Sequence, residues 1–109
     1  MTEQRAWGSY QILGEIPVCV KLLTVNPNSR LSLQTHEHRS EVWYPLQPGL
    51  TAIIGERLIH LEPLTRYLIS KGEKHRLINP TREPLQVVEL MYGFYDEADI
   101  FRIQDDYGR

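Results

Sequence analysis

Short runs of strand-forming residues recur along this chain of 109 residues, and residues that favour turns separate them. Alternating or continuously apolar runs of roughly four to eight residues, bounded by Asn, Pro or Gly, are typical of β-strands. The expected strands cover residues 18–25, 31–36, 41–46, 50–54, 57–61, 66–69, 75–78 and 85–92. Many short strands at near-regular spacing predict a β-sandwich or β-barrel, such as a double-sheet jelly roll. A helical turn is expected only between residues 96 and 103.

The composition limits the classes of protein to which the chain can belong. Apolar residues make up 41% of the sequence, which suits a single core, so we expect one domain over residues 1–109. The apolar runs 18–25 and 85–92 are too short to cross a membrane. A charged N-terminus without a secretory core, and a single cysteine, favour the cytoplasm. The net charge of −2, with acids and bases interspersed, argues against a nucleic-acid partner.

One strand-like segment carries the residue types of a metal site. Because side chains alternate between the two faces of a strand, Gln34, His36 and His38 are expected on one face. Glu41 follows just past them, and a second polar cluster contributes His75. Imidazoles and carboxylates that converge are suited to a first-row divalent metal. The sequence therefore predicts a metal site where the two segments meet.

The same two segments resemble the two sequence motifs of the cupins. The first motif is a histidine, any residue, a histidine, three or four residues and a glutamate; the second has a glycine, a histidine and an asparagine at fixed spacing after a proline. Residues 70–79 match the second motif except that serine stands in the place of the proline. The first motif fits in two registers. If His36 and His38 are the histidine pair, only two residues separate the pair from Glu41, which is fewer than the motif has. If Gln34 stands in the place of the first histidine and His36 is the second, the four residues before Glu41 fit the motif.

A narrower resemblance covers nearly the whole chain. Residues 5–10, 31–43 and 105–109 are similar, in the same order, to the type II mannose-6-phosphate isomerases. These occur as small cupins and as C-terminal domains of bifunctional enzymes that also carry a mannose-1-phosphate guanylyltransferase. The chain departs from the family at Val42, where a histidine is usual, and over residues 44–48, where a proline at position 45 suggests an edge strand or a bulge.

The resemblance implies an all-β, single-domain cupin, a double-stranded β-helix of the jelly-roll type. It implies a metal-dependent isomerase that interconverts mannose 6-phosphate and fructose 6-phosphate. The expected ligands of one divalent ion are Gln34, His36, Glu41 and His75, with His38 as the alternative to Gln34. Zinc is the first choice of metal, and manganese, cobalt, nickel and iron also accept such ligands. Small cupins commonly pair, so a homodimer is expected.

The predicted reaction moves a carbonyl group between neighbouring carbon atoms of a sugar phosphate. A metal would act as the Lewis acid that stabilises the enediolate. Because the ligand carboxylate is occupied by the metal, His38 and Glu73 are the candidates for moving the proton. A phosphate group needs cationic donors. The candidates for phosphate binding are Arg39, Lys71 and Arg109, and Arg109 is also counted among the catalytic residues.

Two further hypotheses stay open on the sequence. Val42 and Ser70 depart from the family motifs, which also fits a non-catalytic cupin that binds a sugar phosphate or a sugar nucleotide. The other hypothesis is a different cupin enzyme, such as a sugar epimerase or a metal-dependent dioxygenase. Arginine at the closing motif favours a phosphorylated substrate over that of a dioxygenase. A guanylyltransferase activity is not expected, because this sequence lacks the nucleotide-binding domain.

Overall fold

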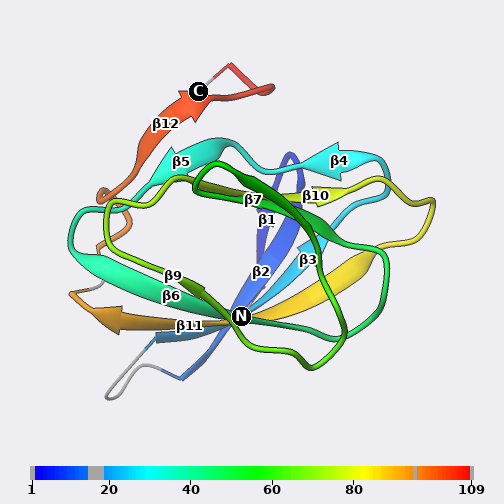
Figure 1. The fold of residues 1–109 in the computed structure, drawn as a ribbon. Helices are drawn as coiled ribbons and strands as arrows, with labels where there is room; N and C mark the ends of the chain where they lie inside the picture. Colours follow the sequence, from blue (N-terminus) through cyan, green and yellow to red (C-terminus); the bar gives the residue numbers. More distant parts are fainter. Residues whose placement is uncertain (1, 15–18, 95, 109) are drawn as a thin grey trace.

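Two antiparallel β-sheets face each other in the computed structural model, which describes residues 2–14, 19–94 and 96–108 (Figure 1). Sheet A has the strand order β1 (Thr2–Arg5), β2 (Gly8–Gly14), β3 (Cys19–Val25), β11 (Leu85–Gly93), β6 (Arg39–Pro45) and β9 (Tyr67–Ile69). Sheet B has the order β12 (Phe101–Gln104), β5 (Leu33–Thr35), β10 (His75–Asn79), β7 (Thr51–Ile54) and β8 (Arg57–His60), and β4 (Ser29–Arg30) also pairs with β10. The described parts of the chain contain no helix, so the all-β prediction is confirmed.

Side-chain alternation decides which residues lie between the sheets. In β3, every second residue from Cys19 to Val25 is buried, and the residues between them are half-buried. The neighbouring strand β11 alternates in the same way from Leu85 to Met91, and the two strands pair in register. Strands β3 and β11 therefore each present one row of side chains to the interior and one row to the outside.

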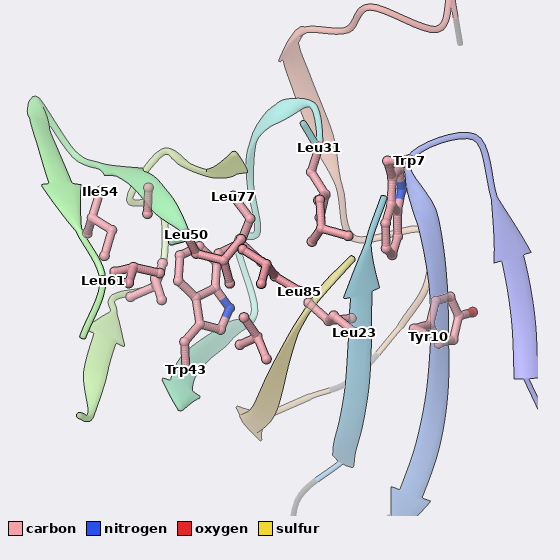
Figure 2. Close-up of a cluster of buried hydrophobic side chains, with 14 residues drawn as sticks. Trp7, Tyr10, Leu23, Leu31, Trp43, Leu50, Ile54, Leu61, Leu77 and Leu85 are labelled. Carbon is pink, nitrogen blue, oxygen red and sulfur yellow. The ribbon is translucent and has the colours of Figure 1, made fainter. Parts of the chain in front are cut away.

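An apolar cluster fills one end of the space between the sheets (Figure 2). Its side chains point toward one another from both sheets, and Trp43 of β6 is only 1% exposed. The other members of the cluster are Trp7, Tyr10, Leu23, Val25, Leu31, Leu50, Ala52, Ile54, Leu61, Ile69, Leu77, Leu85 and Val87. Burial of this apolar surface is the main favourable contribution to folding.

The structure corrects several expectations about local structure. Residues 101–103, expected within a helical turn, belong instead to strand β12, which lies beside β5. The strand expected over residues 31–36 is shorter in the structure, where β5 covers residues 33–35. Strand β6 is not an edge strand, since it lies between β11 and β9. Its proline, Pro45, stands beyond the last pair that β6 forms with β9, so the missing N–H removes no hydrogen bond there. Among the described residues, no helix is long and apolar enough to span a membrane.

Candidate metal centre

Three buried side chains from both sheets converge at the polar end of the interior. Glu41 lies in β6, His75 begins β10, and His36 follows directly after β5. One ligand atom from each of the three lies within 4.8 Å of the others. The Oε1 atom of Glu41 is 3.0 Å from Nε2 of His75 and 3.4 Å from Nε2 of His36. The two segments that the sequence analysis singled out therefore meet in space.

The hydrogen bonds of the two Nδ1 atoms show where each imidazole carries a proton. The Nδ1 atom of His36 is 2.6 Å from the backbone oxygen of Asp99, and Nδ1 of His75 is 2.9 Å from the backbone oxygen of Glu73. A carbonyl oxygen only accepts hydrogen bonds, so each Nδ1 carries the proton and donates it. In the neutral ring, Nε2 then offers a lone pair toward Glu41. Histidine ligands of metals are oriented in this way.

The carboxylate of Glu41 lies where a cation is needed. Burial alone would raise its pKa, but the adjacent imidazoles of His36 and His75 lower the pKa of Glu41 well below its usual range. Its buried Oε1 has no hydrogen-bond partner of acceptable geometry among the described residues. Two ring nitrogens and one carboxylate oxygen thus lie around one point, where a proton on an imidazole or a bound metal ion would balance the negative charge of Glu41. Two nitrogen ligands and one oxygen ligand suit a divalent metal.

Gln34 lies beside this group of ligands. It pairs directly with His75 in the register of β5 and β10, so the two side chains share a face with Cβ atoms roughly 5 Å apart. The side chain is 9% exposed and lines the same cavity as the three ligands. The structure thus brings together all four residues of the first predicted ligand set.

His38 is placed differently from the expectation that it shares a face with Gln34 and His36. The chain bends at residues 37 and 38, where the carboxylate of Asp99 accepts the backbone N–H groups of Glu37 and His38 at 2.9 and 3.0 Å. The bend resets the alternation, so His38 is exposed and is not among the residues that line the cavity.

Arg39, expected at a phosphate, lies instead against the metal ligands. The bend turns its side chain inward, where it is buried in the cavity wall. Its Nη2 atom donates to Nε2 of His36 at 3.2 Å, and its Nη1 atom donates to the backbone oxygen of Asp96 at 3.2 Å. The Nε atom is 3.8 Å from Oε2 of Glu41. A fixed positive charge therefore lies next to the ligand carboxylate.

Two further predicted site residues lie away from the cavity. Lys71 is exposed, and the carboxylate of Glu73 accepts the backbone N–H of Ser70 at 3.1 Å within the turn before β10. Neither residue lines the cavity. The backbone of Glu73 nevertheless contributes to the site, because its carbonyl orients His75. Arg109 lies outside the described residues.

The sequence analysis missed two charged residues that face the interior. Glu89 of β11 stands across from both Lys21 of β3 and Trp43 of β6, and it accepts a hydrogen bond from the Trp43 indole at 2.9 Å. Burial, and then the negative charge of Glu41, raise the pKa of Glu89 well above its usual range. The available signal was that Lys21 and Glu89 interrupt otherwise apolar runs at inward positions.

The unusual residue Val42 does not face the metal ligands. It follows Glu41 in β6 and therefore points to the opposite face of sheet A. Its cross-strand partners there are Leu68 and Leu90. The departure from the family pattern at position 42 consequently changes the outer face of the sheet rather than the cavity.

The ligands line a cavity of about 100 Å³ that opens to solvent at its mouth. Toward sheet A the same cavity is lined by Arg5, Tyr10, Lys21 and Glu97. Lining residues of both charges surround space large enough for a small polar molecule.

Comparison with known families and sequences identifies the relatives of this chain. Residues 1–105 match the family described as Mannose-6-phosphate isomerase C-terminal. The chain is 39% identical over 108 residues to the xanthan biosynthesis protein XanB of Xanthomonas campestris pv. campestris, covering 96% of this chain and 23% of XanB. It is 38% identical over 109 residues to the alginate biosynthesis protein AlgA of Pseudomonas aeruginosa, covering 96% of this chain and 22% of AlgA. A mannose-1-phosphate guanylyltransferase of Klebsiella pneumoniae is 38% identical over 108 residues, with 96% of this chain and 23% of that enzyme covered.

Solved structures confirm the cupin fold. The capsular polysaccharide assembling protein CapF of Staphylococcus aureus superposes with a TM-score of 0.83 at 13% identity, over 95% of this chain and 32% of CapF. The cupin domain of Schizosaccharomyces pombe Cnp3 gives a TM-score of 0.75 at 10% identity, over 86% of this chain and 69% of that domain. At such low identity the likeness concerns the fold alone.

The relatives correct the functional prediction. The sequence analysis assigned the chain the complete role of an isomerase of mannose 6-phosphate, but the chain spans only between 22% and 23% of the length of the three relatives named above. Their names describe guanylyl transfer and polysaccharide biosynthesis. The chain corresponds to one cupin domain of such proteins. The prediction that assigned the isomerase reaction to this chain is therefore wrong. The expected homodimer and cytoplasmic location stay predictions.

Proposed function

Because the chain belongs to the Mannose-6-phosphate isomerase C-terminal family, we propose that it is a metal-dependent, sugar-binding cupin domain. His36, Glu41 and His75, with Gln34 as fourth ligand, hold one divalent ion, and zinc is the first choice. The bound metal supplies a Lewis acid that attracts the oxygen atoms of a sugar. The family description points to a phosphorylated sugar of the mannose type as the ligand class.

One observation carries this proposal. Both imidazoles donate Nδ1–H to backbone carbonyl groups, and both Nε2 atoms lie within 3.4 Å of the same oxygen of Glu41. Each backbone contact orients its ring so that Nε2 faces the carboxylate. Two ring nitrogens and a carboxylate oxygen around one point are a ligand set that suits a divalent cation.

The surroundings favour a polar ligand over an apolar one. Beside the four metal ligands, the cavity wall carries the buried polar side chains of Ser32 and Arg39. A sugar offers hydroxyl groups to such donors and acceptors, whereas an apolar ligand would leave them unsatisfied. Arg39 adds a donor for an oxygen that develops negative charge next to the metal.

The experiment that tests the proposal is metal analysis of the purified protein. Protein reloaded with zinc and desalted should keep about one ion per chain, and His75→Ala should keep far less. The matched control is His60→Ala, because His60 is exposed in β8 and does not belong to the three-residue cluster. Wild-type protein that retains no zinc, manganese, cobalt, nickel or iron would contradict the proposal. So would equal retention by the two alanine variants.

Sugar binding is tested on the same samples. Titration calorimetry with mannose 6-phosphate should give binding to the metal-loaded protein and weaker binding to the metal-free protein. Equal affinity with and without metal would show that the sugar does not contact the ion.

A further inference from the structure

The wall of the cavity opposite the metal ligands holds a second cluster of charged and polar side chains. It consists of Arg5, Tyr10, Lys21 and Glu97, named here the lysine cluster. Lys21 Nζ donates to Oε1 of Glu97 at 3.1 Å and lies 4.0 Å from the centre of the Tyr10 ring. The Tyr10 hydroxyl donates to the same carboxylate oxygen at 3.2 Å and accepts from Nη2 of Arg5 at 3.1 Å. Two donor groups thus converge on one carboxylate oxygen, and Arg5 donates to the hydroxyl group of one of them.

The two charges of the central ion pair differ in how firmly they are held. Lys21 is an inward residue of β3 whose side chain is 7% exposed, whereas the side chain of Glu97 is 58% exposed. Glu97 lies outside the strands, in the segment that follows β11. A buried ammonium group needs a negative partner, and an exposed carboxylate can exchange with another anion at little cost in desolvation. The position that Glu97 Oε1 fills is therefore a preformed anion position.

Spacing connects this position to the metal ligands. Lys21 lies in β3 and Glu41 in β6, and both strands flank β11. Neighbouring strands are about 4.8 Å apart, so the two side chains start roughly 10 Å from each other across one cavity. That separation is on the scale of a phosphorylated six-carbon sugar lying with one end at each site.

The donors of the lysine cluster favour an anion with several acceptor oxygens. Arg5 and Lys21 bring two positive charges; Glu97 pairs with Lys21, and Glu3 lies 3.6 Å from Arg5. Glu89 stands across from Lys21, and its carboxyl group accepts the hydrogen bond of the Trp43 indole. A phosphate monoester carries about −1.5 to −2 charges at pH 7 and has three acceptor oxygens. It would replace the single carboxylate with a better match to the three donors.

We propose that the lysine cluster is an anion subsite that binds the phosphate group of a sugar phosphate, and that Glu97 occupies this subsite in the ligand-free protein. This inference rests on the proposed sugar-binding function of the metal centre. It replaces Lys71, which is exposed outside the cavity, with Lys21 as the principal phosphate-binding lysine. Mannose 6-phosphate would then bind with its sugar oxygens at the metal and its phosphate at Lys21.

The experiment measures phosphate binding in full-length protein by titration calorimetry. Inorganic phosphate is the probe for metal-free protein, and mannose 6-phosphate and mannose are compared on metal-loaded protein. In the Lys21→Met variant, loss of one charge-assisted contact should weaken binding of both phosphate compounds by about 10–150-fold while metal content stays unchanged. The Glu97→Gln variant should bind inorganic phosphate more tightly than wild type, because the internal competitor loses its charge. Lys71→Met is the matched control and should bind as wild type does.

Each outcome separates this inference from the proposed function. Circular dichroism checks the fold of the buried Lys21 variant, and the exposed Glu97 position gives an independent measurement that does not disturb the interior. Metal-loaded protein that binds mannose and mannose 6-phosphate equally would overturn the subsite and leave the metal centre standing. Unchanged phosphate affinity in both the Lys21 and Glu97 variants would do the same. If the wild-type protein cannot be loaded with any metal but still binds phosphate through Lys21, the proposed function is overturned and the subsite stands.

Discussion

The interior of this cupin domain has two ends that are built from the same strands. At one end, β6 contributes Trp43 and β10 contributes Leu77 to an apolar cluster. Two residues earlier, the same strands contribute Glu41 and His75 to the metal centre. The chain thus changes from apolar to polar within one inward row. The apolar end provides the stability that allows the polar end to hold buried ionisable side chains close together.

The energetic contributions at the two ends differ in origin. Removal of a large apolar side chain from the cluster loses favourable transfer free energy and leaves a cavity. At the polar end, Glu41 is 1% exposed and its Oε1 has no hydrogen-bond partner among the described residues. Burial of this carboxylate costs desolvation free energy, which the neighbouring His36, His75 and Arg39 offset. Sites of function commonly carry this kind of local cost.

The largest expected effect is at the apolar end. Trp43→Ala should lower the free energy of unfolding by about 3–5 kcal/mol, because it leaves a large cavity and removes the indole donor from Glu89. Urea denaturation measures the change. Leu58→Ala is the control, since Leu58 is 65% exposed, and it should change stability by less than about 0.5 kcal/mol. Similar losses in the two variants would remove the distinction between the apolar end and the surface.

The second prediction concerns the polar end. Glu41→Gln should weaken zinc affinity by more than about 100-fold, which exceeds the usual effect of changing an outer hydrogen-bond partner. The metal-free variant should also be less stable than metal-free wild type near neutral pH, because the lowered pKa of Glu41 means that folding favours its charged form, and the change removes the carboxylate partner of Arg39. Competition with a fluorescent zinc chelator and thermal denaturation of metal-free protein give the two measurements. A variant that keeps its zinc affinity would contradict the role of Glu41 as a ligand.

A third prediction distinguishes Gln34 from His38, the two residues that the sequence left as alternatives for one metal ligand. Gln34→Leu should reduce metal retention more than His38→Leu, because Gln34 lies beside His75 in the cavity and His38 is exposed in the bend. Zinc content after dialysis against a weak chelator gives the comparison. The reverse order would mean that the bend at residues 37 and 38 rearranges when the metal binds.

The smallest effect is expected at an exposed ion pair outside both ends. Arg30 donates to both carboxylate oxygens of Asp106 at 2.6 and 2.8 Å, and this contact holds the pKa of Asp106 below its usual range. A folded-state pKa below the unfolded value of about 3.9 adds stability above that pH, and this stability is lost as the pH falls through the folded-state pKa. The contribution should be small because both side chains are exposed.

Nuclear magnetic resonance titration of the Asp106 carboxyl carbon tests this sign directly. In wild type the midpoint should lie below that of an unstructured aspartate, and Arg30→Gln should move it upward. An identical midpoint in both proteins would show that the pair does not persist in solution.

Much of the fold could be predicted because strand signals are local. The expected strands at 50–54, 57–61 and 85–92 each lie within about a residue of β7, β8 and β11. The strands β1 and β2 were not predicted, since their residues lack a long apolar or alternating run. Strand β12 was taken for a possible helical turn, and it is extended because it pairs with β5. Its conformation is decided by a neighbour distant in the sequence.

The sequence by itself determined which residue types meet at the candidate site. His36 and Glu41 on one segment and His75 on another carry the motif, and their strands bring them together. Only the tertiary structure decided which neighbours join them. The carboxylate of Asp99 holds a bend that turns His38 out and Arg39 in, and Glu97 from the same loop reaches Lys21. Alternation along a strand is fixed by local backbone geometry, whereas a bend stabilised by a residue some sixty positions later depends on how the whole chain packs.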